Sequence, residues 1–271
     1  MIYKVHHLHC GSMCPFCAPL FGQKGMKAEV VCHCLLLETD QGLVLIDTGL
    51  GLQDYLCADQ RLGGFITRFG TIQQSLNLSA IAQIQKLGFK ATDVKHIIVT
   101  HLDFDHAGGI SDFPQAMVHV LSSEYNATQH WSYKNKYRYR PQQINKHRHW
   151  NFIEPQFGES WFNLEKVQGF KIFQDDILLI PLLGHTEGHC GIAIKQHDQW
   201  LLFCGDAYYS HQQLNPKNKL RALEMTERLF AHNNLQRIQS LKQIQQLAAA
   251  QPEIEIMCAH DPIELKRYQQ Q

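Results

Sequence analysis

The sequence has no excess of charge of either sign, because its 271 residues include 25 Lys and Arg and 25 Asp and Glu. A neutral chain has no net field that would attract nucleic acid or an anionic membrane, although a local basic patch can still form. The chain also lacks an apolar run long enough to span a bilayer. We therefore expect a soluble globular protein with no membrane segment, and the balance of charge weighs against a nucleic-acid partner.

A signal peptide is also missing, since the first ten residues, MIYKVHHLHC, have no apolar core. We expect a cytoplasmic protein whose nine cysteines are mostly reduced. Cys14 and Cys17 have the spacing of a zinc knuckle, but no second Cys-x-x-Cys follows them. A loop of small buried thiols is therefore favoured over a structural zinc site, which stays open as the alternative.

No internal repeat of solenoid length and no low-complexity linker interrupts the chain. With 44% hydrophobic and 18% charged residues, the composition is that of an ordinary globular protein. A chain of this length can bury a sizeable core. We predict a single domain over residues 1–271.

What the sequence does contain is a dense group of metal-binding side chains in residues 100–109, THLDFDHAGG. The group follows an apolar run that is typical of a buried strand, and its paired glycines mark a turn. A compact loop at a strand end can direct His101 and Asp103 one way and Asp105 and His106 the other. This arrangement suits two metal ions side by side; the alternative is a polar loop with two ordinary histidines.

Three more potential ligands, His185, Asp206 and His260, each lie just beyond an apolar strand pattern. The strands are expected at 177–183, 200–203 and 254–257. One such coincidence carries little weight. Together with the strand before His101 there are four, which implies that the strand ends converge on one edge.

Further strands are predicted at 30–38 and 43–46, joined by a turn that contains Gly42, and at 117–121 and 191–195. Asp47 follows the second of these and is either a support for a metal ligand or a turn-forming residue. The periodicity of apolar residues predicts helices over 79–87 and 235–247. The buried side of the second helix is expected to carry Leu235, Ile238, Leu241, Ile244 and Leu247.

Residues 124–162 differ in composition from the rest of the chain, because they are crowded with aromatic and basic side chains. Such a mixture can stack on and neutralise single-stranded nucleic acid. It can also cover an active site, with its rings shaping an apolar pocket. The neutral charge of the whole chain favours a lid, inserted between strands.

These motifs, in this order, resemble the metallo-β-lactamase superfamily over nearly the whole chain. The matching elements are Asp47-Thr48-Gly49, residues 101–106, His185, Asp206 and His260. The resemblance implies an α/β fold of the αββα four-layer sandwich type, with a two-metal site at one edge of its sheets. It places His101, Asp103 and His185 on one metal, and Asp105, His106 and His260 on the other. Asp206 would bridge both.

Within the superfamily, the sequence HLDFDHAGG is similar to the HLHFDHAGG of N-acyl-homoserine lactonases. Tyr209 lies three residues after Asp206, where those lactonases carry a tyrosine that contacts the substrate; Tyr208 beside it is the alternative. Asp103 is the departure, since the family has histidine there. A hard oxygen ligand favours iron or manganese more than histidine does, although zinc remains the first expectation. Homodimers are a further family expectation.

The resemblance implies a hydrolase in which a hydroxide shared by two divalent metals opens a small-molecule lactone or ester. Tyr209 would stabilise the oxyanion, and Asp105 would deliver a proton to the leaving oxygen. His189 is expected to hydrogen-bond its loop and not to bind metal. The alternatives are a phosphodiesterase or nuclease, a thioester hydrolase, and a metal-binding protein without turnover.

Overall fold

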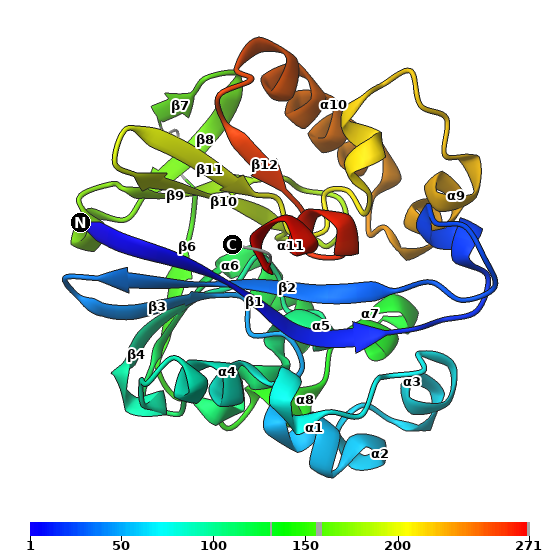
Figure 1. Cartoon of the computed structure of the whole chain (residues 1–271), viewed down its shortest axis with the longest axis horizontal. Helices are drawn as coiled ribbons and strands as arrows, with labels where there is room; N and C mark the ends of the chain where they lie inside the picture. The colour runs from blue at the N-terminus through cyan, green and yellow to red at the C-terminus, as the bar shows by residue number, and fades with distance from the viewer. Residues whose placement is uncertain (131, 156–158, 270–271) are drawn as a thin grey trace.

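The computed structural model describes residues 1–130, 132–155 and 159–269. Within these ranges the chain forms two six-stranded sheets that pack face to face, with helices on their outer sides (Figure 1). This architecture is the αββα sandwich, and the predicted α/β fold class is confirmed.

The first sheet comes from the N-terminal half of the chain. Its first three strands are antiparallel, and the next three continue the sheet in parallel. Parallel neighbours need long crossovers, and helices supply them here. In spatial order the strands are β1 (Ile2–Met13), β2 (Val30–Thr39), β3 (Gly42–Ile46), β4 (Val94–Ile98), β5 (Met117–Leu121) and β6 (Trp150–Ile153).

The second sheet comes from the C-terminal half and is antiparallel apart from its pairing of β11 with β12. In spatial order its strands are β12 (Glu255–Met257), β11 (Gln199–Phe203), β10 (Cys190–Gln196), β9 (Ile177–Pro181), β8 (Leu164–Gly169) and β7 (Glu159–Trp161).

The helices cover the two outer faces. Under the first sheet lie α1 (Leu52–Leu56), α2 (Ala58–Arg61), α3 (Gly64–Phe69), α4 (Ala80–Lys86), α5 (Phe104–Ala107) and α8 (Pro141–Ile144) (Figure 1). The outer face of the second sheet packs against α10 (Asn234–Ala250). The remaining helices are α6 (Ser122–Gln129), α7 (Tyr133–Arg138), α9 (Arg221–Phe230) and α11 (Pro262–Gln269).

Strand β3 shows how the layers are held together. Side chains alternate across a strand, so Leu43 and Leu45 enter the core between sheet and helices. Val44 and Ile46 enter the core between the two sheets. A strand that is buried on both faces reads as a continuous apolar run, which is why the sequence revealed it.

The predicted strands at 30–38, 43–46, 117–121, 177–183, 191–195, 200–203 and 254–257 are all found within a few residues of the expected bounds. The sequence did not lead us to predict β1, β6, β7, β8 or α9. Half of β1 is polar, with histidines at three positions, because it forms the edge of the sheet and pairs only with β2.

The expected buried face of the second predicted helix needs correction at its start. Leu235 is 79% exposed. The first turns of α10 instead bury Arg237 and Ser240. The Arg237 guanidinium donates to the Glu227 carboxylate of α9 at 2.9 Å, so a polar contact replaces an apolar one at this end.

Residues 124–162 form α7, α8, β6 and β7, together with most of α6; residues 131 and 156–158 lie outside the described ranges. Because β6 pairs with β5, part of the segment belongs to the first sheet. The helical part, before β6, lies beside the strand ends. Its role as a lid stays a prediction.

The N-terminal cysteines do not form the expected group of buried thiols. Cys10 is buried in β1, but Cys14 is half-buried and Cys17 is exposed. Among the described residues, the groups of side chains that could hold a metal contain no cysteine.

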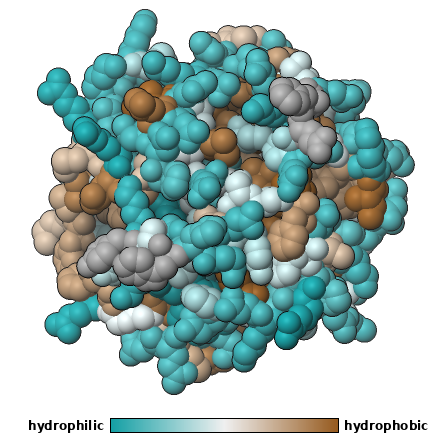
Figure 2. Space-filling view, turned by 180° about the vertical axis from the view of Figure 1, so that it is seen from behind, coloured by the Kyte–Doolittle hydropathy of each residue, from teal (hydrophilic) through white to brown (hydrophobic). Residues whose placement is uncertain are grey.

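The outer surface is mainly hydrophilic on the face that Figure 2 shows, with scattered hydrophobic residues. None of the helices in the described ranges has the length and apolar character needed to cross a bilayer.

Gly184, between β9 and the next candidate ligand, has a φ of +119°, and a Cβ there would lie 2.1 Å from the backbone nitrogen of Arg237. We expect Gly184→Ala to lower the free energy of unfolding by about 3 kcal/mol or more. Gly88 is the matched control, since it has a φ of +90° with no atom within 4 Å of the added Cβ. Gly88→Ala should cost only about 1–2 kcal/mol. Equal decreases in the free energy of unfolding of the two variants, measured by urea denaturation, would contradict this explanation.

Candidate metal centre

Four strand ends meet at one edge of the sandwich and carry the predicted ligands. The loop after β4 carries His101 and leads into α5, whose N-cap is Asp103. The loops after β9, β11 and β12 carry His185, Asp206 and His260. The convergence that the sequence predicted is therefore present in the fold.

Asp206 lies at the centre of this group. Its Oδ2 is 3.0 Å from Nε2 of His260 and 3.4 Å from Nε2 of His185. Its Oδ1 is 3.2 Å from Nε2 of His106, and His101 is 3.9 Å from Oδ2. One carboxylate thus touches side chains from both predicted ligand sets.

The ligand atoms form two compact groups, each with its atoms within 4.8 Å of one another. Both groups are buried. One consists of His101, His185 and Asp206, and the other of Asp105, His106 and His260. Imidazole nitrogens and carboxylate oxygens are the donors that divalent zinc, iron and manganese accept. The site therefore has the donor set for divalent metals.

Unsatisfied atoms at the centre support the same conclusion. His101 Nε2, Asp103 Oδ1 and Asp206 Oδ1 are buried and have no hydrogen-bond partner. Leaving such atoms unpaired costs about 1–3 kcal/mol each, so a convergent group of them requires a ligand. Divalent metal ions bound here would supply partners for such atoms.

The protonation states of His101 and Asp206 match metal binding. Burial, together with the neighbouring His106, holds the pKa of His101 well below its usual value, so its ring is neutral and its lone pair is free. Burial alone would raise the pKa of Asp206. The nearby His260, His106 and His185 outweigh it and hold that pKa well below its usual value, so Asp206 stays ionised. Burial would lower the pKa of His106 and His260, but the nearby Asp206 outweighs it and raises both, so these rings would lose a proton when a metal binds.

Three of the histidine rings are oriented through their second nitrogen. Thr100 Oγ1 lies 3.0 Å from Nδ1 of His101, Asp47 Oδ2 lies 2.8 Å from Nδ1 of His106, and the Val31 carbonyl lies 2.7 Å from Nδ1 of His260. These contacts leave Nε2 of each ring for the metal.

Asp47 supports the site, which resolves the question that the sequence left open. Its backbone is left-handed, with a φ of +54°. Besides His106, its carboxylate accepts hydrogen bonds from the Thr100 backbone N–H and hydroxyl, both at 2.7 Å. Asp47 thereby fastens the end of β3 to the end of β4 beside the ligands.

His189 takes the role expected of it. Its Nδ1 lies 2.8 Å from the Leu182 carbonyl, and its Nε2 accepts from the Asp206 backbone N–H at 2.9 Å. The ring therefore sets the position of the central carboxylate without joining either ligand group.

Asp103 has a partner that the sequence reading did not identify. The guanidinium of Arg138, in α7, donates to Asp103 Oδ2 at 2.5 Å and lies 3.0 Å from His185 Nε2. Burial would raise the pKa of Asp103, but Arg138 and His101 outweigh it and hold that pKa well below its usual value. Asp103 reaches the site, yet it is absent from the compact ligand groups.

Glu124 is a second residue that the sequence reading missed. It is buried, and it accepts from the backbone N–H groups of Leu102 and Gly188, both at 2.9 Å. Because these groups lie in two different ligand loops, Glu124 holds the loops together. No signal in the sequence separates it from other acidic residues at a helix start.

The two neighbouring tyrosines have different surroundings. The ring of Tyr209 lies 5.2 Å from that of His260 and 6.0 Å from that of His185. Burial raises the pKa of Tyr209 well above its usual value, so the hydroxyl stays protonated. Tyr208 is fully buried and donates to Glu264 at 3.0 Å, away from the ligands.

A cavity of about 610 Å³ opens onto these residues. Its floor includes Asp103, Asp105, His185, Asp206 and His260, with Tyr209 and Arg138 at the side. Its walls are mainly apolar, and they include Met13, Phe21, Val30, Phe65, Ile66, Phe69, Phe104, Leu229 and Phe230. An apolar cavity with a few convergent polar groups is the usual form of a small-molecule site.

The fold and this centre are those of a metal-dependent hydrolase. The family model described as the metallo-β-lactamase superfamily matches residues 28–250, and the chain belongs to that superfamily.

Relatives fall into two groups. A protein of Mycobacterium tuberculosis described as a probable metallo-hydrolase is 37% identical over 265 residues, which is 96% of this chain and 80% of that protein. An N-acyl homoserine lactonase of Bacillus thuringiensis is 28% identical over 181 residues, 66% of this chain and 64% of the lactonase.

Solved structures share the fold. An N-acyl homoserine lactone hydrolase with N-hexanoyl-L-homoserine bound at its catalytic metal centre has a TM-score of 0.73 at 21% identity, covering 98% of this chain and 96% of that one. A dizinc quorum-quenching lactonase has a TM-score of 0.63 at 18% identity, covering 97% and 90%.

Asp47→Asn should lower the affinity for metal by about 10- to 100-fold, because both carboxylate oxygens of Asp47 accept hydrogen bonds from Thr100 and His106, and an amide has only one acceptor oxygen. Competition with a chelating dye measures this affinity. Glu38→Gln is the control, since Glu38 pairs with His6 at 2.6 Å, away from the ligands. Wild-type affinity in Asp47→Asn would remove Asp47 from the support of the site.

Proposed function

We propose that this hydrolase opens a small-molecule lactone or ester, with an N-acyl-homoserine lactone as the first candidate. The observation that carries the proposal is the apolar cavity that ends at the ligand groups and at Tyr209. An acyl chain would pack against the apolar side chains of the cavity, and an ester carbonyl would lie against its polar residues. The similarity to a lactonase, which extends along 66% of this chain, adds support.

We assign the ligands as the family resemblance implies, with His101, Asp103 and His185 on one metal and Asp105, His106 and His260 on the other, bridged by Asp206. When bound, the two ions would supply an activated water and a Lewis acid for the carbonyl. Zinc is the first candidate. The negative charge of Asp103 would favour iron or manganese, but Arg138 neutralises part of that charge.

Two residues of the chain are proposed to act on the substrate itself. The protonated Tyr209 hydroxyl would donate to the carbonyl oxygen as negative charge develops there. Asp105, beside His260 on the cavity floor, would carry a proton to the leaving oxygen.

We further propose that residues 1–271 form one domain in which residues 124–162 act as the lid. Lys134, Tyr137 and Arg138 of α7 line the cavity. Arg138 also donates to the Phe230 carbonyl, and Lys134 donates to the Ala231 carbonyl at 2.5 Å. These bonds tie the lid to the C-terminal end of α9 across the cavity.

Acid release from a long-chain N-acyl-homoserine lactone, measured with metal-loaded protein, tests the proposal. Turnover should be efficient in the wild type and lost in Asp206→Ala, which removes the central carboxylate. No turnover by protein that holds two metals would reject this substrate class. Simple esters, thioesters and phosphodiesters would then be tested.

Tyr209→Phe should lower turnover by about 100-fold, because it removes one donor to the oxyanion, and it should leave the metal content unchanged. Tyr208→Phe is the matched control, since that hydroxyl bonds Glu264 outside the cavity. A wild-type rate in Tyr209→Phe would remove Tyr209 from the mechanism.

A further inference from the structure

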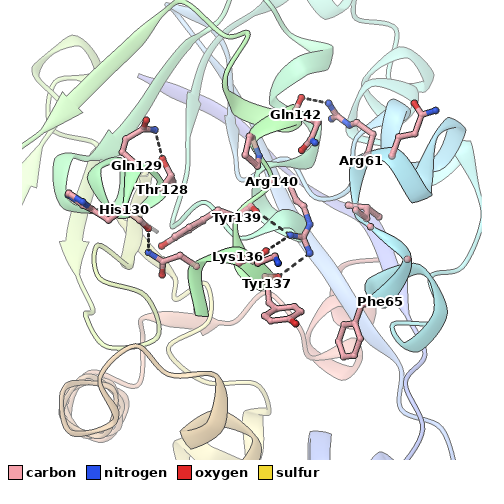
Figure 3. A pocket seen from close by; sticks show the side chains of 16 residues that line it. Arg61, Phe65, Thr128, Gln129, His130, Lys136, Tyr137, Tyr139, Arg140 and Gln142 are labelled. Carbon is pink, nitrogen blue, oxygen red and sulfur yellow. Dashed lines mark hydrogen bonds between the residues drawn. The ribbon is translucent and has the colours of Figure 1, made fainter. Parts of the chain in front are cut away.

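A second cavity, of about 570 Å³, is lined in part by α7 (Figure 3), a helix that also lines the cavity at the metal centre. Its lining comes from α2, α3, α6, α7 and the start of α8. The rings of Phe65 and Tyr137 line both cavities and lie 5.8 Å apart, so they form a shared wall. The two cavities therefore adjoin at these two rings.

The charge of the second cavity is entirely positive. Its lining includes Arg61, Lys136 and Arg140, with the His130 imidazole beside them, and none of its described lining residues is Asp or Glu. Arg61 is already satisfied, since it pairs with Asp54 at 2.8 Å and donates to three further oxygens. Lys136 and Arg140 therefore supply the charge that a ligand would meet.

Arg140 has a donor that is not used. Its two terminal nitrogens donate to the carbonyls of Lys136, Tyr137 and Tyr139, which caps the end of α7. Its Nε is buried and has no hydrogen-bond partner. A buried cationic donor without an acceptor costs more than a neutral one, so an anionic acceptor at this place would be stabilising.

Helix α7 and the residues just after it divide their basic side chains between the two cavities. Residues four apart on a helix share a face, so Lys134 and Arg138 both face the metal cavity and the end of α9. Lys136 of α7 lines the second cavity, together with Arg140, which lies beyond the end of the helix on extended backbone (Figure 3). Tyr137 lines both cavities.

We infer that the second cavity is a subsite for an anionic group at the far end of the substrate, such as a terminal carboxylate, sulfonate or phosphate. The inference rests on the proposed function, because the reacting carbonyl lies at the metal centre. The chain of the substrate runs along the wall that Phe65 and Tyr137 form, and its anionic end meets Lys136 and the free Nε of Arg140. The neutral charge of the whole protein conceals this local field.

The kinetic test compares two lactones with acyl chains of twelve carbons, one ending in a methyl group and one in a carboxylate. The wild type should show the higher kcat/KM for the carboxylate. Lys136→Glu should lower the carboxylate-to-methyl ratio by about fivefold or more, since it replaces an attraction by a repulsion. Lys146→Glu makes the same change in charge at an exposed residue outside the cavity, and should leave the ratio at its wild-type value.

A binding test on the same metal-loaded proteins separates this inference from the proposed function. The probes are naphthalene-2-sulfonate, an aromatic anion that binds metals weakly, and the neutral 2-naphthol. Lys136→Glu should lower the affinity for the sulfonate about fivefold or more and leave the affinity for 2-naphthol unchanged. Lys146→Glu should change neither affinity.

The outcomes are distinct. A carboxylate-to-methyl ratio that Lys136→Glu does not change overturns the subsite, even if the sulfonate binds. Failure to hydrolyse either lactone rejects the lactone substrate. In that case a sulfonate affinity that depends on Lys136 still supports an anion site, and an affinity that does not depend on it overturns the site.

Discussion

The carboxylate of Asp206 is the group on which the architecture of the site depends. It is buried among histidines from three other strand ends, and one of its oxygens has no hydrogen-bond partner in the protein. A buried, ionised carboxylate is costly unless cations or donors surround it. The sandwich brings the strand ends to one edge, and metal ions there would satisfy the carboxylate and the rings together. Asp47, His189 and Glu124 hold the loops in the positions that this requires.

Many of the strands and the candidate metal ligands could be predicted from the sequence, because both leave a signal in neighbouring residues. Strands buried on both faces are continuous apolar runs, and each ligand directly follows such a run, so the sheets and the convergence of His101, His185, Asp206 and His260 could be predicted. Edge strand β1 lacked that pattern. Arg138 and Glu124 act through contacts 35 and 64 residues away along the chain, and no spacing signals such contacts. Leu235 was misplaced because a polar contact between helices replaces apolar packing at that end of α10.

The departure at Asp103 connects the metal centre to the rest of the molecule. A carboxylate in place of the family's histidine needs a counter-charge, and Arg138 supplies it from α7. The same helix closes the side of the apolar cavity, bonds to the end of α9 and carries Lys136 to the second cavity. If Asp103 is a metal ligand as we propose, the change at its position is accompanied by a cationic helix that lines both cavities.

The central claim is that the two ligand groups hold two metal ions. The most direct test is the metal content of protein purified without chelators and then saturated, measured by plasma mass spectrometry against the protein concentration. The account expects two ions per chain in the wild type and a loss of bound metal in Asp206→Ala. A wild-type content that saturates at one ion or fewer would contradict it.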